Sequence, residues 1–173
     1  LEPQSIEDIT AVVALYRPGP MQSIPKYISG KKHPEKVSYR HPMLKSILDV
    51  PYGCMVYQEQ VMEVFRKLAG YSLGKADMVR RAMSKKKFEA LARERESFIY
   101  GNEQDQIAGC VSNGIEAETA NAIFDEIMDF ANYAFNKAHA VCYAVVSYRT
   151  AYLKCHYPQE YMAALLTSVL DFT

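Results

Sequence analysis

The stretch QEQVMEVFRKLAG (residues 58–70) decides the predicted fold class. Its apolar residues recur every three to four positions, which places them on one face of a helix: Val61, Met62, Val64, Phe65 and Leu68. Gly70 fits the left-handed position that commonly ends a helix. We therefore predict a helix over residues 58–69 with one buried face.

The same periodicity extends over nearly the whole chain, with no sustained two-residue alternation, so the predicted fold class is all-α. Further helices are predicted after the cap Ser5 up to Pro18, in a short segment after Pro42, over residues 73–83, from Phe88 to Gly101, in a short piece before Asn113, and over residues 119–130, 137–156 and 159–170. Residues 21–41 hold Pro25, Gly30 and Pro34 and are predicted to be irregular. The segment 137–156 is apolar on most sides, which predicts a buried central helix.

Length and composition set the class of protein. With 173 residues, 49% of them hydrophobic and 23% charged, the chain has enough apolar side chains for the core of one domain, alone or within a larger protein. The start LEPQ is no leader, so we expect a piece of a longer chain. The most apolar run, residues 138–153, is too short and polar to span a bilayer, which predicts a soluble protein. Four scattered cysteines predict reduced thiols rather than a structural zinc site: Cys54, Cys110, Cys142 and Cys155.

The net charge of zero hides a segregation of charge along the chain. Residues 75–87 hold six basic residues against Asp77, and residues 17–48 hold seven against Glu35, whereas residues 101–130 hold seven acids and no Lys or Arg. Dense positive charge beside apolar helical positions suits phosphate. A solvated helix end, where cations complement the helix dipole, is the alternative.

The segment YAFNKAHA (residues 133–140) predicts an anion site. Asn136 is a good helix cap, which places Lys137 and His139 in the first helical turn, where cations oppose the helix dipole and lower stability. Residue choices that are locally unfavourable often mark a functional site. Free N–H groups at the helix start, both cations and Tyr133 would form an anion pocket with an aromatic lid. The alternative is a histidine satisfied by a nearby carbonyl and a lysine that reaches solvent.

Hydrolytic and metal-dependent sites find less support. The chain has no H-E-x-x-H, G-x-S-x-G or P-loop pattern, and its four histidines are widely scattered. The 13 tyrosines are consistent with stacking on bases and equally with packing in the core.

Several segments, in order, resemble one family, the alpha (polymerase) subunit of bacterial DNA polymerase III. They are ALYRPGPM (14–21), YGCMVYQEQVM (52–62), LAGYSLG (68–74), RRAMSKKK (80–87), YAFNKAH (133–139), and AYLK (151–154) with HYP (156–158). The resemblance covers essentially the whole chain and is weakest over residues 101–114. It implies that residues 1–173 are the fingers domain, a mostly helical part that closes over the incoming deoxynucleoside triphosphate (dNTP) and the templating pair.

The resemblance also implies site residues. Arg80 and Arg81 match the arginines of the family motif R-R-A-M-G-K-K-K, and the motif Y-G-F-N-K-S/A-H is matched by Tyr133, Asn136, Lys137 and His139. In the family these segments face the triphosphate and the nascent pair. Arg80, Arg81 and Lys137 would offset phosphate charge, His139 would hydrogen-bond a phosphate or protonate pyrophosphate, and Tyr133 would pack against the nascent pair or the sugar. Ser84 and Ala134 stand where glycine is frequent in the family.

Other expectations concern the rest of the enzyme. DNA backbone contacts are expected from five lysines: Lys31, Lys32, Lys85, Lys86 and Lys87. The chain is expected to hold no catalytic residue, because the carboxylates that bind Mg²⁺ belong to the family's palm, upstream of Leu1. The full-length protein is expected to be a DNA-directed DNA polymerase of the cytoplasm, associated with the nucleoid and not with a membrane, whereas this piece alone is expected to be inactive.

The expected partners are a DNA primer–template, the incoming dNTP, and the sliding clamp and other replisome subunits, the latter through regions outside these residues. Two rival functions stay open. One is a non-catalytic helical nucleic-acid-binding module that uses the same basic segments without a nucleotide pocket. The other is a helical protein-interaction scaffold, which would show no salt-dependent affinity for DNA.

Overall fold

The computed structural model describes residues 1–85, 88–131 and 133–170 of the chain. Within these ranges the chain is helical and forms no strand, which confirms the all-α prediction. The α-helices are α1 (Ile6–Leu15), α2 (Ile24–Lys32), α3 (Lys45–Leu48), α4 (Gln58–Ala69), α5 (Leu73–Ser84), α6 (Phe88–Tyr100), α7 (Ala117–Ala131), α8 (Lys137–His156) and α9 (Pro158–Val169). Short 3-10 helices η1 to η4 cover Pro20–Ser23, Pro34–Lys36, Pro42–Leu44 and Val111–Asn113.

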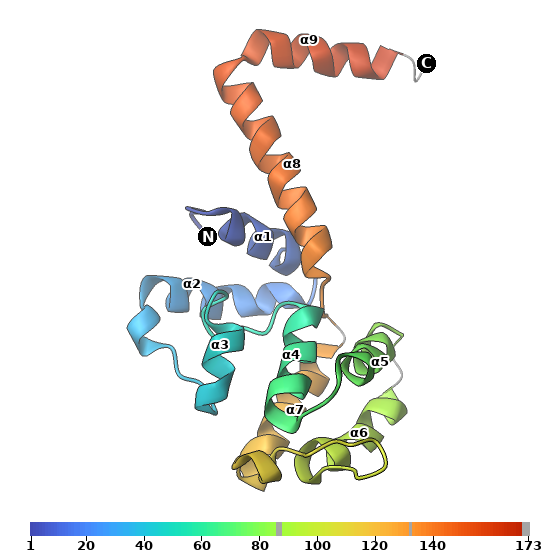
Figure 1. The fold of residues 1–173 in the computed structure, drawn as a ribbon. Helices are drawn as coiled ribbons and strands as arrows, with labels where there is room; N and C mark the ends of the chain where they lie inside the picture. The colour runs from blue at the N-terminus through green and yellow to red at the C-terminus, as the bar shows by residue number, and fades with distance from the viewer. Residues whose placement is uncertain (86–87, 132, 171–173) are drawn as a thin grey trace.

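Helix α4 lies at the centre of the larger of two hydrophobic clusters, among α3, α5, α6 and α7 (Figure 1). The ring of its Phe65 is fully buried and packs against Phe98 and Phe124, with ring centroids 4.8 and 6.0 Å away. Gly70 ends the helix with a φ of 76°, a conformation that costs little only for glycine. The predicted bounds 58–69 are therefore confirmed at both ends.

A second cluster joins α1, α2 and the start of α8. At its centre the Tyr27 hydroxyl donates to the buried Asp8 carboxylate at 2.8 Å, and Lys31 pairs with the same carboxylate at 2.9 Å. Desolvation alone would raise the pKa of Asp8, but hydrogen bonds from the Gln4 N–H, Lys31 and Tyr27 outweigh it and lower the pKa. A buried charge is thus paired and hydrogen-bonded, as stability requires.

The prediction of an irregular segment over residues 21–41 is wrong, because α2 occupies its first part. Pro25 stands in the first turn of α2, where a missing N–H costs no helical hydrogen bond. The side chain of Tyr27 is 1% exposed and anchors the helix to the core. Tertiary packing thus outweighs the weak local helix propensity.

The prediction that residues 137–156 form a buried central helix is correct in its bounds and wrong in its burial. Helix α8 leans on α1 with its first turns and then projects away from the body, with α9 crossing its far end (Figure 1). Only Ala140 and Ala144 of α8 are buried, whereas Tyr148 is 52% exposed. Pro158 stands at the first position of α9, one residue before the predicted start of that helix at residue 159.

The remaining helices lie within two residues of their predicted ends, except that the piece before Asn113 is the single 3-10 turn η4. Cys54 and Cys110 are buried free thiols, and burial raises the pKa of Cys110 to about 12. No helix in the described ranges is both long enough and apolar enough to cross a membrane.

Candidate functional site

The segment that leads into α8 is fastened to the start of α4. The N–H of Phe135 donates to the Val56 carbonyl at 3.3 Å, and the N–H of Gln58 donates to the Phe135 carbonyl at 2.9 Å. The Gln58 side chain also donates from Nε2 to the Ala134 carbonyl at 3.3 Å. These bonds place the first turns of two helices, far apart in sequence, side by side (Figure 1).

The first turn of α8 is capped from two directions. The Asn136 side-chain oxygen accepts from the His139 N–H at 2.8 Å, which confirms the predicted cap. Both carboxylate oxygens of Glu59 lie 3.0 Å from the Lys137 N–H, and one of them accepts from the Asn136 amide at 3.1 Å. The expectation of free N–H groups is therefore wrong for the backbone of Lys137 and His139. A carboxylate from α4 occupies a position that favours anions.

The side chains of Lys137 and His139 are both exposed. The Lys137 ammonium lies 5.5 Å from the centroid of the Tyr57 ring, within the range of a cation–π contact. The His139 ring lies between Phe135 and Tyr143, with centroids 5.5 and 4.6 Å away. Both groups can therefore meet a ligand from solvent without a rearrangement of the core.

Arg80 and Arg81 share the carboxylate of Asp77. Each guanidinium lies 2.7 Å from one of its two oxygens, and these hydrogen bonds, that of Arg80 first, lower the pKa of Asp77. The Arg81 side chain is 68% exposed, so most of its donors face solvent. Arg80 is 27% exposed and also donates to the Gln58 side-chain oxygen at 3.4 Å. Gln58 thus links the basic end of α5 to the segment before α8.

Tyr133 and Arg17 hold the other side of this segment. The Arg17 guanidinium donates to the Tyr133 carbonyl at 2.9 Å and lies 4.3 Å from the centroid of the Phe135 ring. Gly19 adopts a φ of 96°, and a Cβ there would lie 2.3 Å from the Tyr133 ring. The ring of Tyr133 therefore packs directly on the Pro18-Gly19-Pro20 turn, and the residue remains 44% exposed.

Three residues of this arrangement have no role predicted from the sequence: Arg17, Gln58 and Glu59. All three lie in the segments 14–21 and 52–62 that carry the family resemblance. Only this resemblance could have indicated that the three residues matter, because their local spacing does not predict contacts with residues about 80 to 120 positions away.

The lysines expected to contact DNA differ in their surroundings. The Lys31 ammonium donates to the Leu1 and Glu2 carbonyls and to Asp8, so its three donors are all engaged. Lys32 and Lys85 are exposed, whereas Lys86 and Lys87 lie outside the described residues. In the part of the chain that the structure describes, no three His, Cys, Asp or Glu side chains gather in a way that could hold a metal ion.

Comparison with known proteins gives one consistent result. The family described as the bacterial DNA polymerase III alpha subunit finger domain matches residues 1–106. DNA polymerase III subunit alpha of Halalkalibacterium halodurans is 50% identical over 169 residues, which cover 98% of this chain and 14% of the relative. The subunits of Bacillus subtilis and Escherichia coli are 49% and 48% identical over 98% and 100% of the chain. The chain thus spans about one seventh of the length of these relatives.

Proposed function

Since the chain belongs to the bacterial DNA polymerase III alpha subunit family as a fingers domain, we propose that the surface around the starts of α4 and α8 binds the incoming dNTP. The observation that carries the proposal is the junction at residues 57–59. Gln58 contacts both Arg80 and the segment before α8, and Glu59 contacts the first residues of α8. Cations from α5 and α8 are thereby held around one junction, although they are more than 50 residues apart in sequence.

Electrostatics supports a polyanionic ligand at this junction. Arg80, Arg81 and Lys137 bring three positive charges, against the carboxylates of Asp77 and Glu59. A triphosphate, with several negative charges, would compete with these two carboxylates for the same donors. Charge-assisted hydrogen bonds to phosphate are stronger than neutral ones, and arginine favours bidentate phosphate contacts.

Two further residues would orient the nucleotide rather than neutralise it. The exposed His139 ring could donate a hydrogen bond to a phosphate oxygen or a proton to the leaving pyrophosphate. Tyr133, seated on Gly19, presents an aromatic face on which the sugar or the nascent base pair would pack. Asn136 would act through the helix, because it fixes the first turn of α8.

The reaction that this site would serve is nucleotidyl transfer. The primer 3′-hydroxyl loses its proton to solvent and its oxygen forms a new bond to the α-phosphorus. The bond from that phosphorus to the oxygen shared with the β-phosphate breaks, and pyrophosphate leaves with this oxygen. Two Mg²⁺ ions on clustered carboxylates would activate the hydroxyl and stabilise the leaving oxygen. We place those carboxylates in the palm of the full-length polymerase, so that residues 1–173 alone are inactive. For the whole protein we further propose three kinds of partner: a DNA primer–template, a sliding clamp and other replisome subunits. We also propose that the whole protein is cytoplasmic and associated with the nucleoid.

An equilibrium binding experiment tests the site. The full-length polymerase, on a primer that lacks its 3′-hydroxyl, is titrated with each dNTP as wild type, as Arg81→Ala and as Arg93→Ala. The control Arg93 is exposed on α6, away from the junction. We expect Arg81→Ala to raise the Kd roughly 10-fold for every dNTP, since a charged hydrogen bond contributes about 1.5–3 kcal/mol. Equal Kd values for the two variants would favour a nucleic-acid-binding module without a nucleotide pocket.

A further inference from the structure

A groove runs away from Tyr133 along the basic segment 17–48. It consists of two adjoining hollows of about 350 and 500 Å³ that share Lys26 and Glu126 as a common border. Tyr133 and Gly19 line the first hollow, whereas Lys36 and Arg40 line the second. The two hollows therefore adjoin on the surface between α2 and α7, and the first of them begins at Tyr133.

The groove is basic at the end far from Tyr133. Lys26 and Lys36 are exposed, and neither forms a salt bridge with any residue in the described ranges. Arg40 pairs with Glu126 through its Nε at 2.5 Å, and half of its side chain surface stays exposed to solvent. The three cations and one carboxylate leave a net charge of +2 over the border and the second hollow, which suits a phosphate backbone.

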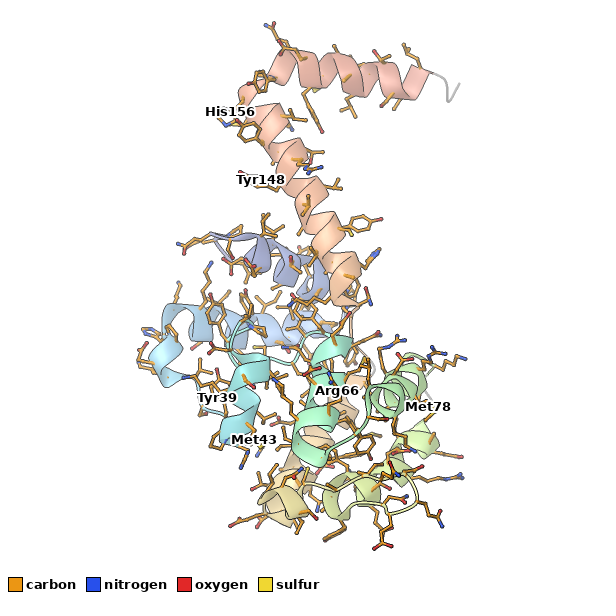
Figure 2. The ribbon with its side chains drawn as sticks, viewed as in Figure 1. Tyr39, Met43, Arg66, Met78, Tyr148 and His156 are labelled. Carbon is orange, nitrogen blue, oxygen red and sulfur yellow. The ribbon has the colours of Figure 1, made fainter. Side chains whose placement is uncertain are left out.

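Aromatic rings line the same path. Tyr39 and Tyr52 line the second hollow, and Figure 2 shows Tyr39 beside α3 and below α2. Tyr52 packs edge-on against the buried Tyr27, with ring centroids 5.2 Å apart, so its ring is held in place. Grooves for single-stranded nucleic acid combine such cations, which follow the backbone, with aromatic rings on which bases stack. A duplex would hide its base faces from these rings.

We propose that this groove holds the unpaired template strand ahead of the nascent base pair. The inference rests on the proposed function, because it takes Tyr133 to mark the position of that pair. A template strand that leaves the pair at Tyr133 would meet Lys26 at the border between the hollows, then Lys36 and Tyr39 in the second. The basic segment 17–48 thus contacts DNA through residues other than Lys31, whose donors are engaged within the core.

Two primer–templates that differ only in the unpaired strand test the proposal. One carries a 5′ template overhang of a single nucleotide and the other an overhang of about 12 nucleotides, within the site size of single-strand grooves. The affinity of the full-length polymerase for each is measured over a range of salt for wild type and for Lys26→Ala/Lys36→Ala. The control Lys45→Ala/Lys67→Ala removes the same charge from exposed lysines outside the groove.

For Lys26→Ala/Lys36→Ala we expect roughly 10-fold weaker binding of the long overhang and a log–log salt slope smaller by about 0.7 per lost single-strand contact. Binding of the one-nucleotide overhang and the KM for dNTP should match wild type, and the control should match wild type throughout. The single charge reversal Lys36→Glu should likewise weaken binding of the primer–template with the long overhang and leave binding of the one-nucleotide overhang unchanged. If binding of both overhangs were weakened equally, or if neither were weakened, the proposal that this groove holds the template strand would be wrong. Failure of the nucleotide site would instead appear as an unchanged dNTP Kd in Arg81→Ala.

Discussion

The Glu59 carboxylate lies 3.0 Å from the Lys137 N–H through both of its oxygens, although the two residues are 78 positions apart. A negative group at the start of a helix is favourable for the helix dipole, whereas the positive charge of Lys137 at the same end opposes it. The same carboxylate fixes Asn136, which caps the helix. Glu59 therefore joins α4 to α8 and holds the first turn of α8 in place.

Replacement of Glu59 should reveal this link as a loss of stability. We expect Glu59→Ala to lower the free energy of unfolding of the 173-residue chain by about 0.5–2 kcal/mol, the range for lost helix caps. Glu59→Gln should lose less, because its side-chain oxygen still accepts from the Lys137 N–H. Urea titrations followed by circular dichroism measure both values. Equal loss in the two variants would mean that the charge alone matters and the hydrogen bond does not.

Gly19 and Gly74 form a matched pair of positions that tests the packing of the Tyr133 ring on Gly19. Gly19→Ala would place a methyl group 2.3 Å from the Tyr133 ring at a φ of 96°, so we expect a loss of more than about 1 kcal/mol. Gly74→Ala meets no atom within 4 Å and lies in α5, so it should leave stability equal or slightly higher. Thermal unfolding of both variants compares them directly. A stable Gly19→Ala chain would show that the turn and ring are not in close contact.

Asp8 gives a prediction for pH. Its pKa is lowered in the folded chain, so its contribution to stability is fully present above the unfolded value of about 3.9 and is lost as the pH falls through the folded value. Asp8→Asn removes the charge that Lys31 and Tyr27 share and should cost about 1.5–3 kcal/mol at pH 7. The deficit, measured by urea unfolding at a series of pH values, should shrink as the pH is lowered below about 3.9. A deficit independent of pH would mean that the amide of the variant fits the site poorly in shape, whatever its charge.

Local signals in the sequence account for what could be predicted. The bounds of α4 follow from apolar spacing and Gly70, and the cap at Asn136 follows from a side chain that bonds three residues ahead. The helix α2 could not be predicted in this way, because the burial of Tyr27 supplies the stability that Pro25 and Gly30 do not. Apolar composition likewise misjudged α8, whose contacts with α1 are made by small alanines while larger side chains stay exposed.

The sequence indicates which residue types the candidate site contains, but it does not indicate the hydrogen bonds that bring their helices together. Arg81, Lys137 and His139 are exposed at helix ends, as their pattern indicates. The bonds that Gln58 makes with Arg80 and Ala134, and Glu59 with Lys137, span 22 to 78 positions and depend on how α4, α5 and α8 pack. Spacing along a single sequence carries no record of such contacts.

Single-nucleotide incorporation by the full-length protein with Lys137→Ala is the most direct test of the proposed nucleotide site. Lys154→Ala, an exposed lysine near the other end of α8, is the control. The proposed site predicts a KM for every dNTP that is raised, or a kcat/KM that is lowered, by roughly 10- to 100-fold in Lys137→Ala alone. The stability of the 173-residue chain should change by less than about 0.5 kcal/mol, as expected for an exposed side chain. Wild-type dNTP kinetics together with a lowered melting temperature in Lys137→Ala would show that Lys137 is a structural residue and does not bind the dNTP.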